Sequence, residues 1–196
     1  LADDLQYDRE HPVFVSTDLG YTDSTAMWFW QLRPDGIAMI DYEEHQGEPL
    51  AFYFKLLRDK GYRYDTIWLP HDARARTLQT GRSTIEQFID EGMPVRIAPK
   101  LEIQHGIDAA RMLLPSVWFH SVKCYEGVEA LRSYRRQFSE ISNSFSDKPL
   151  HDWSSNGADA FRIFATVTKA ARGVKADDPR IIVNKQGLNL DLLFAE

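Results

Sequence analysis

Apolar and turn-forming residues alternate along the first part of the chain in a pattern that predicts three consecutive strands. Residues 13–17 and 26–32 are rich in β-branched and aromatic side chains, which are typical of strands. Pro34-Asp35-Gly36 is a turn signal, and residues 37–42 form a third apolar run. Because the connections are short, we expect these strands to form an antiparallel meander.

A helical repeat follows the three strands. Leu50, Phe54 and Leu57 recur at the spacing of one helix face between residues 49 and 60, and Gly61 is a stop signal. Shorter strands and helices then alternate. We expect strands at residues 66–69, 94–98 and 117–119, and helices at residues 83–91, 102–114, 125–138 and 154–172. The polar residues 139–149 predict a loop or hairpin.

This order predicts an α/β domain. Its sheet is mixed, with three antiparallel strands followed by parallel strands, and helices flank it. We interpret the acidic and polar residues 1–12 as a linker remnant, residues 13–172 as one domain and residues 173–196 as a C-terminal tail. The chain begins with Leu1 rather than methionine, so we expect it to be part of a longer protein.

Composition and charge narrow the class of protein. A hydrophobic content of 43% with 27% charged residues is typical of a soluble globular protein. No apolar run approaches the roughly 20 residues that a membrane span requires, and no signal peptide opens the chain. Cys124 is the single cysteine, which excludes an internal disulfide and a cysteine-based zinc site. The net charge of −6 disfavours nucleic-acid binding by bulk charge, although carboxylates around divalent cations also count as negative.

Three aspartates stand out at the ends or beginnings of predicted elements. Asp18 follows the first strand, Asp72 follows the fourth strand, and Asp159 lies in the last helix. Taken singly, Asp18 fits a turn, Asp72 a helix N-cap, and Asp159 the positive end of a helix dipole. If the fourth strand pairs with the first, the last helix can bring all three carboxylates together. Converging carboxylates repel one another unless divalent cations lie between them.

The order of these elements resembles the ribonuclease H-like fold. Over roughly residues 13–170, the chain is also similar to the C-terminal nuclease domain of the large terminase subunit of tailed phages, a DNA-packaging motor. Three segments carry this similarity: DLGYTDST at residues 18–25, IWLPHDA at residues 67–73 and NGADAFR at residues 156–162.

The resemblance implies a site and a function. Asp18, Asp72 and Asp159 match the catalytic and metal-binding carboxylates of the family, and Asp23 is held as an accessory ligand. The implied cofactors are two Mg²⁺ or Mn²⁺ ions, the arrangement that hydrolyses phosphodiester bonds in two-metal sites. The implied enzyme is an endonuclease that cuts concatemeric double-stranded viral DNA during genome packaging in the host cytoplasm.

The resemblance also implies protein partners. They are an ATPase domain in the same full-length chain, the small terminase subunit and the portal, and no membrane is involved. The G-x-x-x-x-G-K-[ST] phosphate loop that such an ATPase needs does not occur in this sequence. We therefore interpret the chain as the nuclease half of a motor protein.

One segment departs from the family pattern. The family often has a histidine and a small residue just before the final Ala-Asp-Ala, whereas this chain has Asn156-Gly157, with His151 upstream. Asp152 is expected to be a loop residue. His71 has two interpretations, a contact with phosphate or metal-bound water, and an anchor for its own loop. Three acidic residues near the end of the third strand are expected to form a solvated edge: Asp41, Glu43 and Glu44.

Basic residues provide candidate DNA contacts, because phosphates are bound mainly by lysine and arginine. The favoured set lies beyond the Asp72 loop and consists of Arg74, Arg76, Arg82 and Lys100. The predicted helix at residues 125–138 carries a second set, which forms either a phosphate-contacting stripe or only a solvated face: Arg132, Arg135 and Arg136.

Three alternatives to a packaging endonuclease stay open. A Holliday-junction resolvase or a ribonuclease H would share the fold and would cut branched DNA or RNA–DNA hybrids. An actin-like or sugar-kinase-like domain would use DLGYTDST as a phosphate loop, but the chain has no adjacent glycine pair for the second loop. A non-catalytic domain would dock to the portal or a partner subunit, and the presence of all three aspartates disfavours that function.

Overall fold

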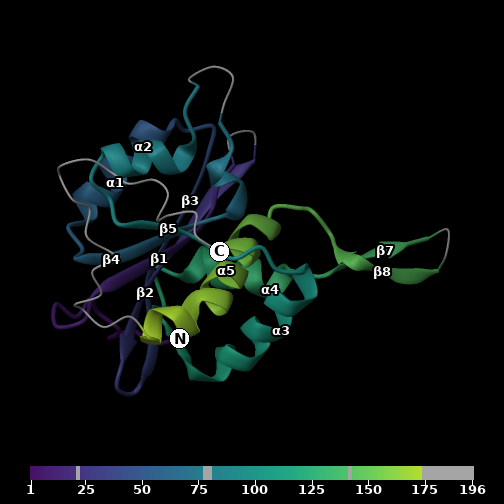
Figure 1. The fold of residues 1–196 in the computed structure, drawn as a ribbon. Helices are drawn as coiled ribbons and strands as arrows, with labels where there is room; N and C mark the ends of the chain where they lie inside the picture. Colours follow the sequence, from purple (N-terminus) through teal and green to yellow (C-terminus); the bar gives the residue numbers. More distant parts are fainter. Residues whose placement is uncertain (21–22, 77–80, 141–142, 174–196) are drawn as a thin grey trace.

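The structure, a computed structural model, describes residues 1–20, 23–76, 81–140 and 143–173. A six-stranded mixed sheet forms its centre (Figure 1). The strands are β1 (Val13–Asp18), β2 (Ser24–Arg33), β3 (Gly36–Gln46), β4 (Tyr64–Leu69), β5 (Val95–Ile97) and β6 (Val117–Phe119). Their order in space is β5-β4-β1-β2-β3-β6, with β1, β2 and β3 antiparallel. Strand β4 runs parallel to β1, β5 parallel to β4 and β6 parallel to β3, which confirms the predicted fold class.

Helices cover both faces of the sheet (Figure 1). Helices α1 (Leu50–Lys60) and α2 (Thr84–Asp90) pack on one face, and α3 (Ile103–Leu113), α4 (Tyr125–Ser133) and α5 (Ser155–Gly173) pack on the other. Two short 3-10 turns, η1 (His71–Arg74) and η2 (Leu114–Ser116), connect elements. Among the helices of the described residues, none has the length and apolar character that a membrane span would need.

Two helix boundaries follow the predicted local chemistry. Helix α1 is followed by Gly61, whose left-handed backbone (φ 63°) closes the last turn. Helix α2 is preceded by a capping box, in which the Ser83 hydroxyl accepts a hydrogen bond from the Glu86 N–H and the Glu86 carboxylate accepts one from the Ser83 N–H. These polar contacts hold the ends of α1 and α2 in place.

The predicted helix at residues 125–138 is too long. Helix α4 ends at Ser133 because Tyr134 adopts an extended backbone (ψ 118°), and the chain continues into a hairpin of β7 (Arg136–Ser139) and β8 (Ser144–Pro149). The hairpin extends away from the rest of the molecule (Figure 1). A hydrogen bond from the Leu150 N–H to the Arg135 carbonyl oxygen closes its base at 2.8 Å. The placement of Arg132, Arg135 and Arg136 on one helix is therefore wrong, because only Arg132 lies in α4.

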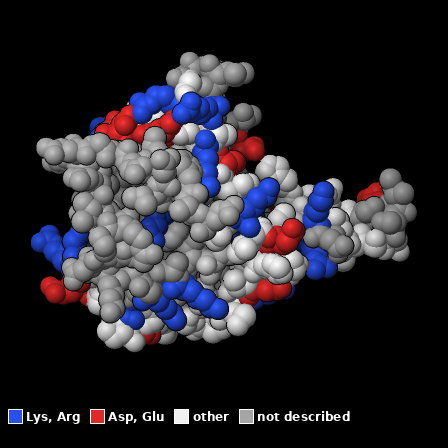
Figure 2. All heavy atoms as spheres, viewed as in Figure 1, with Lys and Arg blue, Asp and Glu red and all other residues white. Residues whose placement is uncertain are grey.

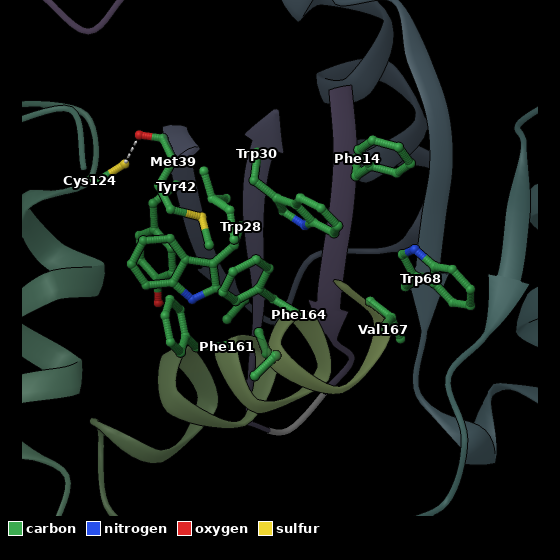
Figure 3. Close-up of a cluster of buried hydrophobic side chains, with 14 of the residues drawn as sticks. Phe14, Trp28, Trp30, Met39, Tyr42, Trp68, Cys124, Phe161, Phe164 and Val167 are labelled. Atoms are coloured by element: carbon green, nitrogen blue, oxygen red, sulfur yellow. Dashed lines mark hydrogen bonds between the residues drawn. The ribbon is translucent and has the colours of Figure 1, made fainter. Parts of the chain in front are cut away.

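Aromatic side chains fill the space between the sheet and α5 (Figure 3). Trp28 and Trp30 of β2 are fully buried and meet Phe161 and Phe164 of α5 edge to face, with ring centroids 5.6 and 5.0 Å apart. The Trp28 indole N–H also donates a hydrogen bond to the Gly157 carbonyl oxygen at 2.8 Å. Burial of large aromatic rings in such pairs is strongly stabilising. Helix α5 is therefore fixed on the sheet along its first three turns.

Gly157 lets α5 approach the sheet closely. A Cβ atom at this position would lie 2.6 Å from the Tyr42 hydroxyl and 3.2 Å from the Ala130 Cβ, and 2.6 Å is shorter than a normal non-bonded contact. The neighbouring Asn156 is also buried, with its amide nitrogen 3.5 Å from Glu44. Asn156 and Gly157, the two residues that depart from the terminase pattern, thus form part of the contact between α5 and β3.

Strand β3 carries a buried ion-pair network where a solvated edge was expected. Asp41 is only 5% exposed, and its carboxylate accepts hydrogen bonds from Lys60 at 2.6 Å and from the Tyr62 hydroxyl at 2.8 Å. Lys60 also donates to Glu43 at 2.6 Å, while Glu44 accepts a hydrogen bond from Tyr42. The expectation is wrong because the end of α1 places Lys60 over β3, a tertiary contact that the strand pattern does not reveal.

Replacing Lys60 by methionine keeps most of the apolar stem and removes the cation that compensates Asp41. We expect the free energy of unfolding to fall by about 3 kcal/mol, because a buried carboxylate loses its partner. Urea denaturation at neutral pH measures this change. Lys55→Met is the matched control: it removes an exposed ion pair with Asp59 and is expected to change stability by less than about 0.5 kcal/mol. Equal losses in both variants would contradict the role assigned to Lys60.

Candidate active site

The three predicted aspartates line one cleft of about 690 Å³. Asp18 comes from the end of β1, Asp72 from η1 directly after β4, and Asp159 from the second turn of α5. Strands β1 and β4 are parallel neighbours, so their carboxyl ends lie at the same edge of the sheet. The predicted adjacency of the first and fourth strands is confirmed.

Contacts of Gly20 with Asp23, Ser24 and Thr25, close to the start of β2, help to position Asp18. Side chains of a strand alternate between its two faces, and Asp18 lies on the same face as Phe14, which packs in the α5 cluster. The Gly20 N–H donates to the Thr25 hydroxyl oxygen at 3.1 Å, and the Thr25 hydroxyl donates to the Gly20 carbonyl at 2.8 Å. A Cβ on Gly20 would lie 2.9 Å from the Asp23 carbonyl oxygen. The glycine therefore allows the backbone after Asp18 to lie close to the start of β2.

The Asp18 carboxyl group has a high affinity for protons. Burial raises the pKa of Asp18 from 3.8 to about 7, and the negative charge of Asp159 adds to the increase. Asp72 and Asp23 contribute smaller increases, while the Arg162 guanidinium opposes them. The carboxylate form of Asp18 is thus disfavoured by lost solvation and by like charges, and additional positive charge in the cleft would favour it.

Asp159 is held through one of its two carboxylate oxygens. Arg162 Nε donates a hydrogen bond to Oδ1 at 3.0 Å, and Arg162 Nη2 forms an ion pair with the same oxygen at 2.8 Å. Tyr134 lies directly after α4, and its hydroxyl donates a hydrogen bond to the same oxygen at 3.3 Å. The side chains of Asp159 and Arg162 are 32% and 19% exposed. Both helices α4 and α5 therefore contribute to the orientation of this carboxylate.

Asp72 is exposed in the first turn of η1. It does not cap that turn, because Pro70 occupies the N-cap position and no side-chain capping hydrogen bond is present there. The interpretation of Asp72 as an N-cap is therefore wrong. Its neighbour His71 also lines the cleft, while the buried Ala73 fixes the turn in the core.

Asp23 and His151 meet beside the cleft. Asp23 Oδ2 lies 3.4 Å from His151 Nε2, and both side chains are exposed. Neither residue is among the described residues that line the cleft. Asp23 is nevertheless close enough for its negative charge to raise the pKa of Asp18. Asp152 lies in the loop before α5, as predicted, and accepts hydrogen bonds from the Ser154 N–H and hydroxyl at 2.9 and 2.6 Å.

Of the basic residues predicted to contact DNA, only Lys100 is among the described residues that line the cleft. Arg74 is exposed in η1 two residues after Asp72. Arg76 pairs with Glu86 at 3.4 Å. The remaining arginines also have acidic partners: Arg82 with Asp90, Arg132 with Glu129 and Arg135 with Asp152. On the face visible in Figure 2, Lys and Arg side chains are mixed with Asp and Glu and do not gather in one patch.

Sequence reasoning missed four polar residues of the cleft: Glu102, His105, Arg162 and Thr166. Arg162 follows Asp159 by three positions, a spacing at which oppositely charged side chains pair on a helix. This signal was present in NGADAFR. His105 gave no comparable signal, because only the packing of α3 against α5 brings it to the cleft.

The donor chemistry of the cleft fits a hard divalent cation. Carboxylate oxygens are preferred by Mg²⁺ and Mn²⁺. The half-buried Asp18 lies near Asp72 and Asp159, so a cation in the cleft would stabilise its ionised form. Among the described residues, however, no group of three or more His, Cys, Asp or Glu side chains is arranged to hold an ion as it stands. A complete ligand set therefore requires a rearrangement of these side chains.

Comparison with solved structures places this fold among nuclease domains of phage large terminases. The large terminase of a thermophilic bacteriophage, in complex with ADP, has a TM-score of 0.65 and 18% identity, over 86% of this chain and 43% of that chain. The large terminase nuclease domain of bacteriophage SPP1 with bound Mn has a TM-score of 0.63 and 15% identity, over 86% and 94%. The large terminase nuclease of the thermophilic phage G20c with bound magnesium gives 0.57 and 15%, over 81% and 84%.

These similarities show the fold. The chain spans less than half of the ADP-bound large terminase but covers most of the isolated nuclease domains. No protein-family model matches the chain, and no curated protein matches its sequence. The predicted ribonuclease H-like fold and the predicted resemblance to terminase nuclease domains are confirmed.

The raised pKa of Asp18 predicts a pH-dependent stability in the absence of divalent cations. Since the folded-state pKa is about 7 and the unfolded-state pKa is about 4, the native state binds more protons between these values. The free energy of unfolding therefore falls as the pH rises through this range. We expect Asp18→Asn to stabilise the metal-free protein at pH 8 by up to about 4 kcal/mol and to have almost no effect at pH 4.

Urea denaturation in EDTA at the two pH values measures this effect. Asp152→Asn is the matched control, because hydrogen bonds from Ser154 lower the pKa of Asp152, and its replacement is expected to destabilise the protein at pH 8. A stabilisation by Asp18→Asn that is equal at both pH values would show that titration of Asp18 is not its cause.

Proposed function

We propose that this domain is a divalent-metal-dependent endonuclease that cuts concatemeric viral DNA during genome packaging. The observation that carries the proposal is the convergence of Asp18, Asp72 and Asp159 in one cleft of a domain with the fold of terminase nucleases. The bound Mn of the SPP1 domain and the bound magnesium of the G20c domain support a divalent cofactor here.

Asp18, Asp72 and Asp159 would hold two Mg²⁺ or Mn²⁺ ions. Bound ions of this kind activate water and stabilise the charge that develops on phosphate oxygens during phosphodiester hydrolysis. The chain itself supplies the position of each carboxylate: the end of β1 for Asp18, η1 for Asp72 and the anchored helix α5 for Asp159. Because Asp18 is poorly solvated, its attraction to a cation is stronger than that of an exposed carboxylate.

Double-stranded DNA is the proposed substrate. Lys100 in the cleft and Arg74 beside Asp72 would contact phosphates close to the aspartates. Arg76 and Arg82 form exposed ion pairs with acidic residues. Such pairs are weak, so we propose that DNA phosphates replace the acidic partners. Cutting is expected to be largely independent of sequence, because phosphate contacts carry no direct base information.

The proposed setting is the full-length packaging motor. The large terminase solved in complex with ADP is more than twice as long as its matched part, which supports an ATPase domain elsewhere in the same full-length chain. We propose the small terminase subunit and the portal as further partners, and the host cytoplasm as the place of action.

Nicking of supercoiled plasmid in Mn²⁺ or Mg²⁺ tests the proposal. We expect the parent chain to nick the plasmid, and Asp18→Asn, Asp72→Asn and Asp159→Asn each to reduce nicking to background, because each removes a charged metal ligand. Asp152→Asn is expected to retain activity, since asparagine also accepts the hydrogen bonds that begin α5. Retained nicking in Asp72→Asn or Asp159→Asn would show that the site is assigned wrongly.

The same assay distinguishes the enzymes that share this fold. A packaging endonuclease is expected to cut linear and supercoiled duplex at least as well as a four-way DNA junction or an RNA–DNA hybrid. A strong preference for the junction would indicate a resolvase, and a strong preference for the hybrid a ribonuclease H. Calorimetry with ATP, expected to give no binding, tests the phosphate-loop alternative.

A further inference from the structure

Arg162 and Tyr134 hold the Asp159 carboxylate by only one of its two oxygens. Arg162 directs both Nε and Nη2 to Oδ1, at 3.0 and 2.8 Å, rather than one nitrogen to each oxygen. Tyr134 donates its hydroxyl proton to the same Oδ1 at 3.3 Å. The second oxygen, Oδ2, takes part in none of these three contacts, two hydrogen bonds and one ion pair, and is left for another partner in the cleft.

The packing of α3 against α5 fixes the Arg162 side chain. Its stem crosses α3 at the buried Gly106, where a Cβ would lie 3.3 Å from the Arg162 Cβ and 3.4 Å from its Cδ. A glycine inside a helix destabilises it by roughly 0.5–1 kcal/mol relative to alanine. Its presence in α3 at this crossing therefore has a local reason, which is the space that the stem of Arg162 needs.

We infer that Arg162 is a positioning residue, which holds Asp159 by Oδ1 and thereby presents Oδ2 to a divalent cation. This inference rests on the proposed metal-dependent function. Hydrogen-bond partners that orient a metal ligand typically contribute a factor of about 10–100 to metal affinity. The charge of Arg162 acts in the opposite direction, since a guanidinium repels a cation. The two effects have opposite signs, so the sign of the change in affinity distinguishes them.

Binding of Mn²⁺ to the 196-residue chain tests the inference, with the electron paramagnetic resonance signal of free Mn²⁺ as the readout. We expect Arg162→Gln and Arg162→Lys to raise the Kd for Mn²⁺ by about 10-fold or more, because neither side chain can direct two nitrogens to Oδ1. Gly106→Ala is expected to raise it as well, by displacing the stem of Arg162 without a change of charge.

Arg111→Gln is the matched control. Arg111 and Asp108 form an ion pair with the same three-residue spacing, but on the exposed surface of α3 and at 3.6 Å. We expect this variant to bind Mn²⁺ like the parent chain. At saturating Mn²⁺, Arg162→Lys is expected to recover most of the parent nicking rate. The reason is that a residue that acts only through metal affinity no longer affects the rate once the site is filled.

Three results would overturn the inference without affecting the proposed function. Tighter Mn²⁺ binding by Arg162→Gln would make Arg162 a competing cation, and an unchanged Kd with a lower metal-free melting temperature would make it a purely structural residue. Nicking by Arg162→Lys that stays low at saturating Mn²⁺ would assign Arg162 a direct contact with the substrate. A parent chain that binds no Mn²⁺ would instead refute the proposed function, and the inference with it.

Discussion

The close packing of α5 against the sheet is the constraint on which the candidate site depends. Trp28 reaches the backbone of α5 at Gly157, and Phe161 and Phe164 continue the contact along the helix. Asp159 and Arg162 belong to the same turns of the helix. The position of the carboxylate relative to the end of β1 is therefore set by the aromatic core rather than by a flexible loop, and a site on rigid elements keeps its geometry.

The acidic residues on the two faces of the sheet have different environments: Asp41 is buried and Asp18 is half-buried. On the α1 side, Asp41 is compensated by Lys60 and Tyr62, so the charge stabilises the fold. On the α5 side, Asp18 stands among other aspartates, and burial raises its pKa to about 7. A group with so strongly perturbed a proton affinity in a cleft is typical of a functional site. Of the two residues, Asp18 therefore destabilises the fold when it is ionised, whereas the charge of Asp41 is compensated.

The sequence predicted most of the fold because local signals agree with the tertiary structure. The meander, the Gly61 stop and the capping box at Ser83 are encoded within a few residues each. The end of α4 was not predictable in this way, because no glycine or proline marks it. The chain leaves the helix for a hairpin whose base is closed by the hydrogen bond from Leu150 to Arg135.

The candidate site was predicted in part for the same reason. Asp18, Asp72 and Asp159 follow from the order of the elements and from the resemblance to terminases, and the structure brings all three to one cleft. The Lys60–Asp41 pair and the contact of Arg162 with Gly106 depend on helix packing. Contacts of this kind join residues far apart in the chain, so no local sequence pattern predicts them.

Tyr42 fills the space that two glycines leave open. A Cβ on Gly157 would approach its hydroxyl at 2.6 Å. A Cβ on Gly127 of α4 would approach the Trp28 ring at 2.5 Å and the Tyr42 ring at 2.8 Å. The volumes of the residues at these positions are therefore linked, since packed interiors leave no room for an uncompensated methyl group. In related sequences these positions are expected to covary, with a larger residue in α5 accompanied by a smaller one in β3, and a larger residue in α4 by smaller ones in β2 and β3. The spacing between α4, α5 and the sheet is then conserved even where the residues that set it are not.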